Sequence, residues 1–109
     1  MPGWHPGHSG HMFVVVFRAV ILNSDEHYLA QAKRMRELAI EKYGCLDITS
    51  ATEADHEITV SYWQSKQHIE AWKKDAEHMQ AQRDGINKWY RSYRIEVAEI
   101  VKKHGTKMA

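Results

Sequence analysis

Apolar and polar residues follow two different periods along this chain, and the switches between them predict its elements. The run Phe13–Leu22 is β-branched and aromatic with a single charge, Arg18, which is typical of a strand covered on both faces. A weaker strand is predicted over 45–52. After a turn at 53–55, the segment His56–Trp63 alternates polar and apolar residues with a period of two, as expected of a hairpin partner.

Helical spacing fills the segments between these strands. Asn23 and Glu26 form a capping box, so we expect a helix from Ser24 to Tyr43, ended by Gly44. The helix is followed directly by the weaker strand.

A second helical region follows the third strand. Ser65 is its expected N-cap, Trp72 lies on its apolar stripe, and Gly85 is expected to break it into two pieces. A last strand begins near Tyr93 and runs to about Lys103. The order strand, helix, strand, strand, helix, strand predicts an α+β, ferredoxin-like βαββαβ domain, with helices on one face of an antiparallel sheet.

The first strand is apolar on both sides, although helices cover only one face of such a sheet. Its two sets are Phe13, Val15 and Phe17 on one side and Val14, Val16 and Val20 on the other. Two sheets packed face to face in a homodimer would cover the second set. A side-by-side arrangement is the alternative, and it would leave those residues wet.

Length and charge exclude several classes of protein. The chain has 109 residues, one domain's length, and a net charge of +1, which gives no basic field to hold a nucleic acid. No apolar run approaches the length of a membrane span. With one cysteine, Cys45, and no signal sequence, the pattern favours a cytoplasmic protein without an internal disulfide.

The ends of the chain differ from its middle. We expect a flexible His, Gly and Pro leader over 1–11, one domain over 12–104 and a frayed tail over 105–109. Metal binding by the leader's histidines is the alternative, but a mobile tail fixes no ligand geometry. The remaining histidines lack the spacing of a local ligand set, so no metal site is predicted: His27, His56, His68, His78 and His104.

One stretch resembles a known family, the antibiotic biosynthesis monooxygenase domain family. The resemblance is carried by the Tyr-Trp-x-Ser junction that opens the run Tyr62–Lys73, and it extends over about Met12 to His104. Further matching positions are Glu77, His78, Ala81, Gln82, Gly85, Trp89, Tyr90, Tyr93, Val97 and Ala98. Membership implies a dimeric α+β barrel with a pocket between sheet and helices in each subunit. It does not imply one reaction, because the family includes cofactor-free oxygenation, haem degradation and quinone-related chemistry.

The haem-degrading branch is disfavoured by two positions. The resemblance places that branch's iron-ligating histidine at Gln82, and an amide is a poor iron ligand beside imidazole. The branch also has an asparagine in the first strand, whereas this chain has none before Asn23.

Cofactor-free oxygenation needs only a base, donors for the resulting anion and a dry cavity for dioxygen. His78 is the candidate base, because imidazole is largely neutral at pH 7. Trp72 is the candidate donor through its indole N–H. A structural histidine and a core tryptophan are the alternatives for these two residues.

The remaining candidates are substrate-binding residues. We expect a mostly apolar cavity between the sheet and the second helical region, lined by Trp72, His78 and some of Phe17, Trp89 and Tyr93, with ordinary packing as the alternative. Arg18 and Arg94 are candidate anchors for an anionic substrate, unless they reach the rim or pair with a carboxylate such as Glu96.

Two functions therefore remain open at almost equal weight. The first is a small monooxygenase that uses dioxygen and no cofactor on an aromatic or polyketide-like molecule. The second is a non-catalytic or stress-related dimer that holds such a molecule. No phosphate loop, nucleophile elbow or dinucleotide fingerprint is present in the sequence.

Overall fold

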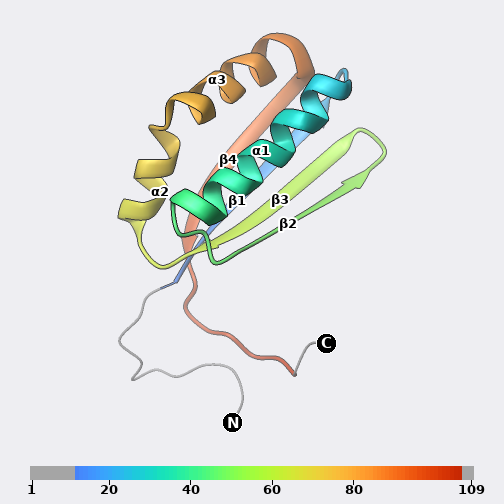
Figure 1. The fold of residues 1–109 in the computed structure, drawn as a ribbon. Helices are drawn as coiled ribbons and strands as arrows, with labels where there is room; N and C mark the ends of the chain where they lie inside the picture. Colours follow the sequence, from blue (N-terminus) through green and yellow to red (C-terminus); the bar gives the residue numbers. More distant parts are fainter. Residues whose placement is uncertain (1–11, 107–109) are drawn as a thin grey trace.

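The computed structural model describes residues 12–106, and these residues form one antiparallel sheet with helices on one face (Figure 1). The strand order is β2-β3-β1-β4, with β1 (Phe13–Ile21), β2 (Asp47–Glu53), β3 (His56–Trp63) and β4 (Tyr90–Glu99). The helices are α1 (Glu26–Lys42), α2 (Lys66–Lys73), α3 (Ala76–Asp84) and a π-helical segment, η1 (Gly85–Trp89). The predicted ferredoxin-like α+β fold is confirmed.

The predicted leader over 1–11 and positions 107–109 of the predicted tail lie outside the described residues. Between residues 12 and 106, no helix is long and apolar enough to cross a membrane.

The first helix begins later than its sequence signal suggests. Its N-cap is Asp25, whose Oδ1 accepts the backbone N–H of Tyr28 at 2.9 Å, and not Asn23. The backbone N–H groups of Leu22 and Asn23 instead donate to the carbonyl of Trp89, at 2.7 and 3.3 Å. Because this long-range contact holds residues 22 and 23 beside the end of η1, the capping role passes to the next side chain able to fill it.

The second helical region breaks before the expected glycine. Asp75 caps α3 by accepting the N–H groups of Glu77 and His78, so the chain turns between α2 and α3. Gly85 keeps a helical backbone and opens η1. The last strand then starts at Tyr90 rather than Tyr93, because Tyr90 pairs with the end of β1 through a register shift after Val20. It ends at Glu99 rather than near Lys103.

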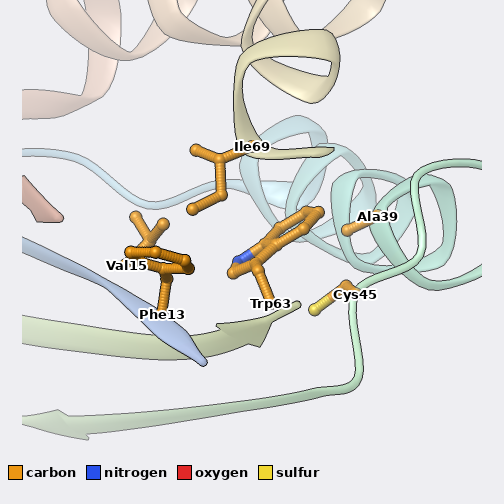
Figure 2. Close-up of a cluster of buried hydrophobic side chains, with 6 residues drawn as sticks. All are labelled: Phe13, Val15, Ala39, Cys45, Trp63 and Ile69. Atoms are coloured by element: carbon orange, nitrogen blue, oxygen red, sulfur yellow. The ribbon is translucent and has the colours of Figure 1, made fainter. Parts of the chain in front are cut away.

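A compact apolar cluster joins the sheet to the first two helices. Figure 2 shows the Trp63 indole between the β1 side chains and the α1 and α2 side chains, and Trp63 is fully buried. Its Nε1 donates to Ser61 Oγ at 2.9 Å, so the buried N–H is satisfied. The cluster consists of Phe13, Val15, Ala39, Cys45, Trp63 and Ile69.

Strand register decides which residues face the helices. Val15 lies opposite Ser61 and Val16 opposite Val60, and residues directly opposite each other share a face. The polar set of β3 therefore points toward the helices, and its apolar set points away. We call the helix-free surface the open face; its apolar residues are Val14, Val16, Val20, Ile58, Val60 and Tyr62.

Candidate functional site

A cavity with a volume of about 150 Å³ lies between the helix-covered face of the sheet and the helices. A closed apolar cavity of that volume holds one benzene ring, but this cavity is partly open to solvent, so a larger molecule can extend out of it. Residues from every strand and helix line it. The five residues predicted to line a cavity all do so: Phe17, Trp72, His78, Trp89 and Tyr93.

His78 is the buried histidine of this cavity. Only 8% of its surface is exposed, its ring lies on the Trp72 indole with centroids 4.1 Å apart, and its Nδ1 has no hydrogen-bond partner. Burial lowers the pKa of His78 below its ordinary value of 6.5, although a hydrogen bond to the Lys73 backbone and the charge of Asp75 act in the opposite direction. The imidazole is therefore neutral at pH 7 and able to accept a proton.

Two contacts fix the start of the helix that carries His78. Asp75, which caps α3, accepts a hydrogen bond from Tyr43 Oη at 2.5 Å, and this bond lowers the pKa of the Asp75 carboxyl. Arg34 on α1 donates to both carboxylate oxygens of Glu77, at 2.8 and 3.0 Å. Both contacts connect α1 to the first turn of α3, so the position of the imidazole depends on packing between the two helices.

Three buried side-chain atoms in residues 12–106 lack a hydrogen-bond partner, and all three belong to residues that line the cavity. They are Gln31 Oε1, Trp72 Nε1 and His78 Nδ1. Buried polar atoms in folded proteins are nearly always paired. This grouping therefore indicates a site that offers hydrogen bonds to a ligand.

An aromatic group with one carboxylate forms another part of the cavity wall. Phe17 packs against Tyr90 and Tyr93, with ring centroids 5.5 and 6.4 Å apart. Tyr28 packs against Trp89 at 5.2 Å, and the Tyr28 hydroxyl donates to Glu57 Oε2. Burial first, and then the charge of Glu57, raise the pKa of Tyr90 to about 12, so its phenol is neutral.

Sequence reasoning did not single out three of these lining residues: Tyr28, Gln31 and Glu57. The position of Glu57 in the cavity could have been predicted from its strand, because Glu57, Thr59 and Ser61 are alternate residues and lie on the same face of the sheet. Recognising that this face meets the helices needs the pairing with β1, which no local pattern contains.

The two arginines proposed as anion anchors lie elsewhere. Arg18 and Arg94 are directly opposite each other on β1 and β4, on the open face, and neither lines the cavity. Arg94 Nε instead lies 3.3 Å from a carboxylate oxygen of Glu96, the alternative raised by the sequence. Strand parity explains the correction: Arg18 follows Phe17, so it points to the opposite side of the sheet.

The sequence matches a family model described as monooxygenase af470-like over residues 11–100. The uncharacterized protein YqjZ of Bacillus subtilis (strain 168) is 39% identical over 89 residues, which cover 81% of this chain and 78% of that protein. The chain belongs to the monooxygenase af470-like family. This family is of the antibiotic biosynthesis monooxygenase type, so the resemblance seen in the sequence is confirmed.

Solved structures share the fold of this family member at low sequence identity. A putative antibiotic biosynthesis monooxygenase from Nitrosomonas europaea superposes with a TM-score of 0.71 at 13% identity, covering 86% of this chain and 94% of that one. SnoaB, a cofactor-independent oxygenase from Streptomyces nogalater, superposes with a TM-score of 0.68 at 8% identity, covering 80% of this chain and 90% of SnoaB. A conserved protein from Methanosarcina mazei Go1 superposes with a TM-score of 0.71 at 12% identity, covering 83% of this chain and 93% of that protein.

Haem does not suit the residues that line this family member's cavity. Gln82, the position where the resemblance places an iron ligand, lines the cavity as an amide. Among residues 12–106, no three His, Cys, Asp or Glu side chains are grouped closely enough to hold a metal ion.

Gly85 shapes the aromatic wall of the cavity. A Cβ at this position would lie 2.2 Å from a ring carbon of Tyr90. Replacing a helical glycine with alanine normally stabilises a protein, but here the contact with the Tyr90 ring should make the substitution destabilising. We expect Gly85→Ala to lower the free energy of unfolding in urea by about 1–3 kcal/mol.

Gly105→Ala is the matched control for this substitution, because nothing lies within 4 Å of a Cβ at position 105. It should unfold like the wild type. Equal stability of Gly85→Ala and Gly105→Ala would show that the Tyr90 ring moves aside without cost.

Proposed function

We propose that this protein is a cofactor-independent monooxygenase that acts on a small aromatic or polyketide-like molecule. The observation that carries the proposal is the neutral, buried His78 imidazole, whose unpartnered Nδ1 belongs to the same mostly apolar cavity as the unpartnered Trp72 N–H. Family membership supports the general kind of chemistry.

The proposed reaction starts with proton transfer. His78 Nδ1 accepts a proton from an acidic carbon or hydroxyl of the substrate, and the Trp72 N–H donates to the oxygen on which negative charge develops. An apolar wall favours this transfer by keeping bulk water away from the anion.

The electrons come from the substrate. For a methylene carbon activated by an aromatic ring, the carbanion adds dioxygen and forms a peroxide on that carbon. Protonated His78 returns its proton to the distal oxygen, the O–O bond breaks, and the carbon loses its second hydrogen. The methylene becomes a carbonyl, one oxygen atom enters the product and the other leaves as water, so no external reductant is consumed.

We further propose that the protein works as a homodimer joined through the open face. Val14, Val16, Val20 and Val60 are only half-buried in one chain, and Ile58 is 38% exposed. Covering this apolar surface by a second copy would remove it from water and place both cavities on the outer sides of the two sheets.

The decisive experiment measures oxygen uptake by the purified protein with an anthrone-type substrate, together with mass spectrometry of the product in labelled dioxygen. We expect one labelled oxygen atom in each product molecule. If the molecule binds without oxygen uptake, while small aromatics co-purify with the protein, the cavity serves binding alone and the enzyme proposal fails.

A further inference from the structure

Glu57 is the one acidic residue among those that line the cavity in residues 12–106. It is half-buried on β3, and its Oε2 accepts the hydroxyl hydrogen of Tyr28. Within the described part of the chain it forms no ion pair. A partly buried carboxylate without a cation is costly to maintain, so its placement in an aromatic wall needs a reason.

The surroundings of Glu57 offer it little besides this one donor. Its cross-strand neighbours are Ala19 and Thr52. The two cations that line the cavity have partners of their own: Arg36 donates to Ser50 Oγ at 3.1 Å, and Lys73 lies 3.8 Å from Glu70. A carboxylate can accept several hydrogen bonds, so Glu57 retains capacity for a further donor.

Glu57 and His78 belong to different parts of the cavity. His78 lies on Trp72, and Trp72 packs against Trp63 with ring centroids 5.0 Å apart, at the end of β3. Extended backbone from Glu57 to Trp63 spans about 20 Å. The cavity therefore has an imidazole near one end of β3 and a carboxylate near the other.

We propose that Glu57 selects the ligand: it accepts a hydrogen bond from a hydroxyl group of an uncharged aromatic ring and repels rings that carry a carboxylate. The Tyr28 hydroxyl donates to the same carboxylate as a structural contact between α1 and the sheet, and in this proposal it does not decide which ligand binds. This inference rests on the proposed role of the cavity as a site for small aromatic molecules. It adds that the ligand enters as a neutral hydroxylated aromatic and not as an aromatic acid.

A purely structural role for the pair makes a different prediction. If the Tyr28–Glu57 hydrogen bond serves only to attach α1 to the sheet, Tyr28→Phe and Glu57→Gln change stability and leave ligand preference alone. If Glu57 selects the ligand, only the substitution that removes its charge changes preference.

The test compares naphthol with naphthoate at neutral pH, with binding followed by quenching of tryptophan fluorescence. We expect the wild type to bind naphthol at least about tenfold more tightly, because a hydrogen bond to a charged group is replaced by repulsion between like charges. Glu57→Gln should lower this ratio about tenfold, whereas Tyr28→Phe and the charge-preserving Glu57→Asp should keep the preference for naphthol.

Thermal unfolding of each variant identifies any that fail to fold. Binding to the wild type alone shows which of the two ligands, naphthol or naphthoate, is preferred. Equal or tighter binding of naphthoate by the wild type overturns the inference, and so does an unchanged ratio in folded Glu57→Gln. Oxygen uptake is measured separately: selective binding without uptake contradicts the monooxygenase proposal only, and uptake without selectivity contradicts this inference only.

Discussion

Replacing His78 with alanine should lower turnover of an anthrone-type or phenolic substrate by about 100-fold or more, the usual contribution of a positioned general base. Oxygen uptake under saturating substrate measures this effect. His78 is the buried imidazole of the cavity and its Nδ1 has no partner, so no other described lining residue is a histidine able to replace it.

The pH profile gives a second measure of the same role. Burial lowers the pKa of His78 below 6.5, so the neutral base persists into mildly acidic solution and the rate should fall only below that value. Stability changes in the same direction: the unfolded chain binds the proton more readily, so the folded state loses stability as pH falls from 6.5 toward the lower pKa of the folded state. His78→Ala should remove the acid limb and this part of the pH dependence.

His27→Ala is the matched control, because His27 is an exposed histidine of α1 that does not line the cavity. It should keep wild-type turnover and the wild-type pH profile. If folded His78→Ala turns over substrate as the wild type does, the imidazole is not the base.

Val16→Lys should convert a dimer of twice 12.7 kDa into a monomer of 12.7 kDa in sedimentation at low micromolar concentration. Val16 lies in the middle of the open face, opposite Val60 on β3 and Glu96 on β4. A lysine here gains a cross-strand carboxylate in the separate chain, so the monomer remains tolerable. In the dimer it brings two ammonium groups into an interface expected to bury more than about 2,000 Å², at a cost of several kcal/mol.

Ile40→Lys is the matched control for assembly, since Ile40 is 48% exposed on α1, away from the open face. It should sediment as the wild type does, and circular dichroism reports whether each variant remains folded. A wild-type protein that sediments at 12.7 kDa would contradict the dimer itself.

The sequence was sufficient for the order of the elements because each has a strong local period. It also placed Trp72 and His78 on one cavity, although their ring contact forms across the break between α2 and α3 rather than along one helix. It was insufficient where a distant group decides the outcome. The Trp89 carbonyl prevents Asn23 from capping α1, and the Tyr90 ring determines the need for glycine at 85.

The same limit explains the arginines and Glu57. A period of two separates the residues of a strand into two sets, but only pairing with a neighbouring strand shows which set meets the helices. Phe17 was assigned to the cavity correctly, and Arg18, its neighbour on the strand, must then point to the other face of the sheet. Deciding which residues of β3 face the cavity required the register of β3 with β1.

In β3 the polar residues face the helices and the apolar residues lie on the open face. This arrangement makes the strand far more sensitive to a change in its length than to a single substitution. Substitutions at 57, 59 and 61 alter the ligand side alone, and substitutions at 58, 60 and 62 alter the open face alone. Deleting one residue inside β3 would shift the register of everything beyond it and move carboxylate and hydroxyl groups onto the apolar surface. Relatives that keep this architecture should therefore tolerate substitutions in β3 more readily than changes in its length, and insertions and deletions should collect in the turn at 54–55.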